Sequence, residues 1–150
     1  MNGNQEVFRR IEKKYIVDEP TYEKLIKKLD RHFVKDRYYK STICNIYYDT
    51  PSHQLVRNSI EKPVYKEKLR GRSYGVPKDE DMVVEELKKK YKGVVYKRRI
   101  EMTLAQTRDF FAGKDVPHDN PQIENELKYF LIFYEGIAPA MYLSYDRLAY

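Results

Sequence analysis

The stretch that most constrains this chain lies between Val64 and Arg99, where cations recur with a two-residue period. It begins V-Y-K-E-K-L-R-G-R-S-Y, so that Lys66, Lys68, Arg70 and Arg72 occupy every second position. In a β-strand alternate side chains point to the same face, and these four cations would then share one face. The positions between them are mostly neutral or apolar. The pattern predicts a strand with one cationic face and one face that packs against other residues.

Two further segments, V-V-E-E-L-K-K-K-Y and K-G-V-V-Y-K-R-R, repeat this charged alternation. They are predicted to form a hairpin that turns at Lys92-Gly93, because glycine supplies the positive φ that a tight turn needs. The predicted register pairs Tyr91 with Val94, Lys88 with Lys97, and Glu86 with Arg99. Two lysines placed directly opposite each other repel, which destabilises a sheet unless an anion or a carboxylate lies between them. The hairpin therefore predicts an anion-binding surface.

The distribution of charge supports a localised anion site. Residues 62–99 hold 13 Lys and Arg against 6 Asp and Glu, whereas the rest of the chain holds 16 against 17. A solvated charged face is the simpler interpretation of one such strand, but here neighbouring strands repeat the pattern. Lining a curled sheet with Lys and Arg is costly unless phosphate-like ligands neutralise the charge, and Arg suits phosphate particularly well. RNA bound with the help of tyrosine stacking stays an alternative.

Other chemistries find little support in the sequence. Cys44 is the only cysteine, which rules out an internal disulfide and predicts a small buried residue. His32, His53 and His118 have no metal-ligand spacing, and no glycine-rich nucleotide motif or nucleophile elbow occurs. No run of about 20 apolar residues suggests a membrane span. We expect a cytoplasmic protein with a reduced cysteine.

The 150 residues suit a single domain without linker or internal repeat. The patterns predict strands at 7–17, 43–49 and 141–150 beside the three charged strands, and helices at 18–31, 52–59, 103–112 and 120–134. Together they predict an α+β fold. In it an antiparallel sheet curls with its polar face inward, and the helices pack outside.

Five segments in order resemble a known family: R-I-E-K-K-Y-I-V, I-Y-Y-D-T, Y-K-E-K-L-R-G-R-S-Y-G, V-V-E-E-L-K-K-K-Y-K-G-V-V-Y-K-R-R and Y-L-S-Y-D-R-L-A-Y. They resemble the VTC domain, the polyphosphate polymerase domain of the vacuolar transporter chaperone family, from about Phe8 to Tyr150. The resemblance implies membership of the CYTH-like triphosphate tunnel metalloenzymes, in which antiparallel strands close into a basic tunnel. It also implies transfer of the γ-phosphate of ATP to inorganic polyphosphate with a divalent metal, Mn²⁺ or Mg²⁺.

Site residues follow from the resemblance by motif. The catalytic set that it implies is Lys14, Arg70, Arg72, Lys88 and Arg147. The further phosphate-binding residues are Arg10, Lys68, Lys97 and Arg99, and the candidate metal ligands are Glu12 and Glu86. Phosphoryl transfer depends on charge neutralisation and positioning more than on covalent help, which agrees with this cationic set.

In one respect the chain departs from the family pattern. Family members continue past Y-D-R-L-A-Y into further tunnel strands, one of which carries the main metal-binding Glu. We therefore expect an incomplete tunnel here, which a further segment or a partner chain would complete. Two alternatives remain: a related enzyme that hydrolyses triphosphate, and a non-catalytic module that binds polyphosphate or RNA. For a polyphosphate polymerase, the expected ligands are ATP and inorganic polyphosphate, and no specific nucleic acid is expected as a partner.

Overall fold

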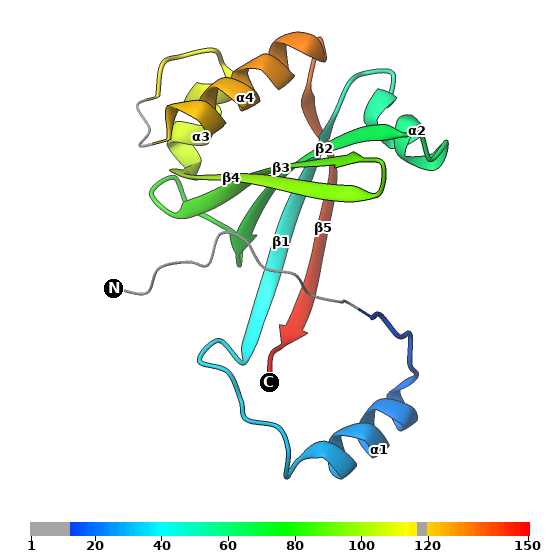
Figure 1. The fold of residues 1–150 in the computed structure, drawn as a ribbon. Coiled ribbons are helices and arrows are strands. Elements are labelled where there is room, and N and C mark those ends of the chain that lie inside the picture. The colour runs from blue at the N-terminus through cyan, green and yellow to red at the C-terminus, as the bar shows by residue number, and fades with distance from the viewer. Residues whose placement is uncertain (1–12, 117–119) are drawn as a thin grey trace. The chain divides into compact units, whose positions relative to one another are not determined.

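The computed structural model describes residues 13–116 and 120–150, and the chain divides into two compact units (Figure 1). The first contains the chain up to Asp36 together with Tyr150, and the second runs from Arg37 to Ala149. Helix α1 (Glu19–Leu29) belongs to the first unit. The Asp18 carboxylate accepts a hydrogen bond from Thr21 N at 3.0 Å and caps the first turn of the helix. The single-domain organisation stays a prediction.

The strand predicted at 7–17 is wrong in its described part. Residues 13–17 have no regular secondary structure, and Ile16 is fully exposed. A strand needs a neighbour for its backbone groups, and none of these five residues takes part in a ladder among the described residues. Charge alternation followed by Y-I-V expresses a β preference but cannot supply that neighbour. Residues 7–12 lie outside the described part of the chain.

The second unit is built on one antiparallel sheet with the strand order β4-β3-β2-β1-β5. Its strands are β1 (Lys40–Asp49), β2 (Tyr65–Tyr74), β3 (Met82–Tyr91), β4 (Val94–Thr103) and β5 (Ala138–Leu148). The helices are α2 (Gln54–Ile60), α3 (Leu104–Phe111) and α4 (Pro121–Phe133). All of them lie where the sequence predicts them, within a few residues at each end. The sheet twists strongly, because β1 and β5 run across the direction of β3 and β4 (Figure 1).

The predicted hairpin register is confirmed. Lys88 pairs with Lys97 and Glu86 with Arg99, and the turn residues Lys92 and Gly93 both have positive φ, at 46° and 85°. Two successive positive φ values make the two-residue turn that matches the twist of the flanking strands. The local chemistry of Lys92-Gly93 thus fixes which side chains stand opposite each other across the hairpin.

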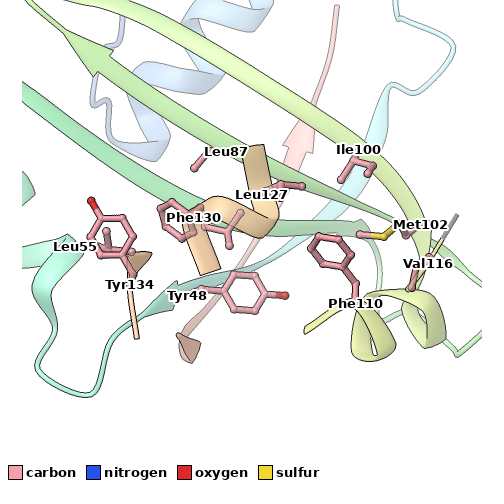
Figure 2. Packing of buried hydrophobic residues seen from close by; sticks show 11 residues of the cluster. Tyr48, Leu55, Leu87, Ile100, Met102, Phe110, Val116, Leu127, Phe130 and Tyr134 are labelled. Carbon is pink, nitrogen blue, oxygen red and sulfur yellow. The ribbon is translucent and has the colours of Figure 1, made fainter. Parts of the chain in front are cut away.

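Helices α3 and α4 cover one face of the sheet, and the core lies between (Figures 1 and 2). Leu69 of β2 and Leu87 of β3 are directly opposite each other and almost wholly buried there. The cluster consists of Tyr48, Leu55, Leu69, Leu87, Ile100, Met102, Phe110, Val116, Leu127, Phe130 and Tyr134. Cys44 is buried, as predicted. Among the described residues, no helix is long and apolar enough to cross a lipid bilayer.

Replacing Leu69 with alanine tests whether this face of the sheet forms the hydrophobic core. Leu69→Ala should lower the free energy of unfolding by about 2–5 kcal/mol, because it leaves a cavity among close-packed neighbours. Leu148→Ala, at an exposed position of β5, is the matched control and should change it by less than about 1 kcal/mol. Denaturant titration measures both. Equal losses in the two variants would show that Leu69 is not part of the core.

Candidate anion-binding face

The face of the sheet opposite α3 and α4 carries the cations predicted from the sequence. In β2 the buried residues Leu69 and Gly71 alternate with Lys68, Arg70 and Arg72, which keep access to solvent. We call this surface the cationic face. It consists of Lys68, Arg70 and Arg72 of β2, Glu86 and Lys88 of β3, and Lys97 and Arg99 of β4. The alternation arises because successive side chains of a strand point to opposite faces of the sheet.

The strand register brings three lysines into one row across the face. Lys68 pairs with Lys88, and Lys88 pairs with Lys97, so the three stand on adjacent strands. We call these residues the lysine row. Neighbouring strands of a sheet lie about 4.8 Å apart, which places the backbones of the three lysines within roughly 10 Å of one another. In the described part of the chain, none of the three ammonium groups has a carboxylate within salt-bridge distance.

The electrostatics of Lys88 reflect this crowding. Burial lowers the pKa of Lys88, and the charges of Lys97, Lys68 and Arg70 lower it further. Glu86 acts in the opposite direction but does not offset them. Like charges directly opposite one another destabilise a sheet. An anion placed over the row would relieve that repulsion, and the lysine row is therefore the centre of the candidate site.

Beside the lysine row, Glu86 holds two arginines. The Glu86 carboxylate, itself 5% exposed, accepts hydrogen bonds from Arg70 on β2 and from Arg99 Nε on β4, the latter at 2.7 Å. Burial acts to raise the pKa of Glu86, but the hydrogen bond from Arg99 and the charges of Arg70, Arg99 and Lys97 keep it below its ordinary range. Two arginines against one carboxylate leave a net positive charge in a fixed arrangement.

Glu85, the next residue towards the N-terminus, points to the core side of the sheet. It is 2% exposed and accepts a hydrogen bond from the Tyr48 hydroxyl at 3.2 Å, while its other oxygen has no partner. Burial raises the pKa of Glu85 to about 7, although the Tyr48 hydrogen bond acts to lower it. Gly71 leaves room for this carboxyl, because a Cβ there would lie 2.7 Å from Glu85 Oε1.

Strands β1 and β5 continue the same face with different chemistry. Arg72 donates from Nε to Asn45 Oδ1 at 3.3 Å, and the Arg70 guanidinium lies 5.9 Å from the centre of the Tyr47 ring. Asn45 and Tyr47 thus orient the two arginines from the neighbouring strand. Arg147 of β5 pairs with Ser41 and shares this face, but it lies about 14 Å further along the strands than Arg72.

The structure thus brings together six of the predicted site cations: Lys68, Arg70, Arg72, Lys88, Lys97 and Arg99. It does not bring Arg147 to them, since that residue lies near the far end of the face. Lys14 belongs to the first unit, so its assignment to the site stays a prediction. Arg10 and Glu12 lie outside the described residues.

Of the two candidate metal ligands, the structure describes Glu86. Both carboxylate oxygens of Glu86 are engaged by guanidinium groups. Residues 13–116 and 120–150 contain no group of three His, Cys, Asp or Glu side chains that could hold a metal ion. The divalent metal site therefore stays a prediction.

Sequence reasoning missed two features. Glu85 follows the parity of Val83 and Leu87, which could have placed it in the core. Lys62 and Lys92 flank the sheet at the hairpin end, where the sequence was interpreted only as a turn. Their proximity in space depends on how the chain enters β2, and no periodicity encodes that.

Comparisons with known proteins agree with this geometry. The family model described as "VTC domain" matches residues 9–150. A crystal structure from Bacillus halodurans, described provisionally as an adenylate cyclase, superposes with a TM-score of 0.57 at 17% sequence identity. The match covers 88% of this chain and 61% of that one. At this identity the likeness shows the fold, which is of the CYTH-like, triphosphate-tunnel type. A search of curated proteins gave no significant match.

The two adjacent glutamates give opposite pH dependences of stability. Since the pKa of Glu85 is raised from 4.5 to about 7, its contribution to stability is complete below pH 4.5 and is lost as the pH rises to about 7. The loss is on the order of 3 kcal/mol. Glu85→Gln should match the parent protein near pH 4.5 and be more stable at pH 8, as thermal unfolding at several pH values would show.

Glu86→Gln is the matched control for Glu85→Gln. The pKa of Glu86 is lowered, so its ion pairs stabilise the fold above the ordinary pKa of a glutamate and are lost as the pH falls. This variant should be less stable than the parent at pH 8 and approach it in acid. A Glu85→Gln effect that does not vary with pH would contradict the assignment of a neutral carboxyl in the core.

Proposed function

Because the chain belongs to the VTC domain family, we propose that it binds inorganic polyphosphate on its cationic face and extends it with the γ-phosphate of ATP. The observation that carries the proposal is the lysine row. It places three cations side by side, and none of them has a salt-bridge partner in the described part of the chain. Repulsion of this kind is what a chain of phosphates would neutralise.

The rest of the face suits phosphoryl transfer. Such a reaction needs the charge of the phosphate oxygens neutralised and the reacting groups aligned, with little covalent help from the protein. Arg70 and Arg99 are held in place by Glu86, and Arg72 by Asn45, so their guanidinium groups need little reorganisation when phosphate arrives. The lysine row supplies mobile ammonium groups beside these fixed arginines. Mn²⁺ or Mg²⁺ would reach the site bound to the phosphates of ATP.

A triphosphate hydrolase is the second candidate. Three lysines in one row match three linked phosphates as well as they match a segment of a polymer. The fold likeness to a protein described as an adenylate cyclase favours a nucleoside triphosphate as one ligand. The two candidates differ in the acceptor of the phosphoryl group, which is the polymer end in the first and water in the second.

Incubation with ATP and Mn²⁺, followed by electrophoresis of the products, tests the proposal. We expect long polyphosphate to form, and Lys88→Gln to slow its formation about 100-fold, as loss of a charge-stabilising group does in other enzymes. The double variant Lys40→Gln/Lys78→Gln is the control, since both lysines are exposed and lie at the other end of the sheet.

Three outcomes would contradict polymer synthesis. Orthophosphate without polymer would indicate the hydrolase. Tight polyphosphate binding without turnover would indicate a binding module, and RNA that competes equally at the same phosphate concentration would indicate a general polyanion binder. Equal activity of Lys88→Gln and the control would show that the lysine row is not part of the site.

A further inference from the structure

A second basic feature lies at the end of β2 and β3, beyond the lysine row. It is a hollow of about 510 Å³ at the β3–β4 turn, which we call the lysine hollow. Its lining residues are Lys62, Pro63, Val64, Lys66, Lys90, Lys92 and Gly93. Four of the seven are lysines, and no acidic residue is among them. The hollow therefore has the charge of an anion site.

The backbone holds the walls of the hollow in place. Lys92 N donates a hydrogen bond to Val64 O at 3.0 Å, which ties the segment before β2 to the hairpin turn. Lys62 has a φ of 52°, and Pro63 fixes its own φ and restricts the backbone of Lys62 before it, so this segment has little freedom. Lys66 Nζ donates to Ser59 O at 3.1 Å and anchors the same wall to the end of α2. The hollow is thus largely formed before any ligand binds.

The hollow continues the series of rows on the cationic face. Lys66 pairs with Lys90, two residues along from the pair of Lys68 and Lys88. Two residues of a strand span about 7 Å, and the six residues from Arg70 to Val64 span about 20 Å. A cationic track of this length exceeds what one triphosphate can contact. It suits a linear polyanion that runs from the arginines over the lysine row into the hollow.

The composition of the hollow favours an inorganic chain over a nucleic acid. Its lining residues include no aromatic side chain, whereas proteins that bind single strands use aromatic rings as stacking platforms. Its cations are all lysines, which act as point charges and do not require the bidentate geometry of arginine. Such a lining can hold successive phosphates of a uniform polymer in any register.

We propose that the lysine hollow binds the phosphates of long polyphosphate that extend beyond the lysine row, and so makes the domain prefer long polymer to triphosphate. This inference rests on the proposed function, because it assigns the hollow to the same ligand. It adds a determinant of chain length that lies outside the phosphoryl-transfer residues. Lys62 and Lys90 are suited to a test, since neither ammonium group has a hydrogen bond or ion pair within the described residues.

The test compares the affinities of tripolyphosphate and long-chain polyphosphate for three proteins at one ionic strength. These are the parent protein, Lys62→Gln/Lys90→Gln and the control Lys40→Gln/Lys78→Gln, which removes the same net charge. The hollow variant should bind long polyphosphate about tenfold more weakly or worse, because one charge-assisted hydrogen bond contributes about that factor and the variant removes two ammonium groups. Its affinity for tripolyphosphate should match that of the parent, and the control should match the parent for both ligands.

Failure of this inference is distinguishable from failure of the proposed function. If the parent binds both compounds equally, or if the hollow variant and the control lose the same affinity, the lysine hollow is not a polymer site and the cationic face stands. If the parent binds neither compound, the proposed function fails and the inference with it. If RNA occupies the hollow with the affinity of long polyphosphate, the preference for an inorganic chain is overturned.

Discussion

The pairing register of β2, β3 and β4 is the constraint on which the rest of this structure depends. It sets Lys68, Lys88 and Lys97 in one row and Arg70, Glu86 and Arg99 in the next, while Leu69 and Leu87 meet on the other face. A slip by one residue would turn the lysines into the core and the leucines into solvent. The buried leucines therefore hold the cations in their repulsive arrangement. Hydrophobic burial thus offsets the electrostatic repulsion between the cations on the opposite face.

Glu85 and Glu86 show how the two faces differ as environments. Both are buried, yet the pKa of Glu85 is raised by desolvation, and the pKa of Glu86 is lowered by the arginines on either side. The core side accepts a carboxyl that keeps its proton up to about pH 7, and the cationic side accepts one that is ionised. This contrast exists before any ligand binds, and it makes the cationic face the one that favours anions.

Much of this arrangement could be predicted from the sequence. The two-residue period of Lys68, Arg70 and Arg72, the turn at Lys92-Gly93 and the helix predicted at 103–112 each depend on local chemistry, and the structure confirms them. Features that depend on pairing between distant segments could not be predicted. Examples are the β2–β3 register that adds Lys68 to the lysine row, and the absence of residues 13–17 from every β-ladder of the described chain. The lysine hollow also belongs here, since two of the segments that line it are distant in sequence and are linked by the backbone hydrogen bond from Lys92 N to Val64 O.

The central claim is that the lysine row is a site for phosphates, and the titration of Lys88 tests it most directly. NMR of the lysine side-chain ammonium and ε-methylene groups can follow Lys88 with and without tripolyphosphate, with the exposed Lys40 as internal reference. In the free protein the pKa of Lys88 should lie below its ordinary value of 10.5, because burial and the neighbouring cations disfavour its charge. Tripolyphosphate should raise the pKa of Lys88. An ordinary pKa for Lys88 that does not respond to the ligand would contradict the account.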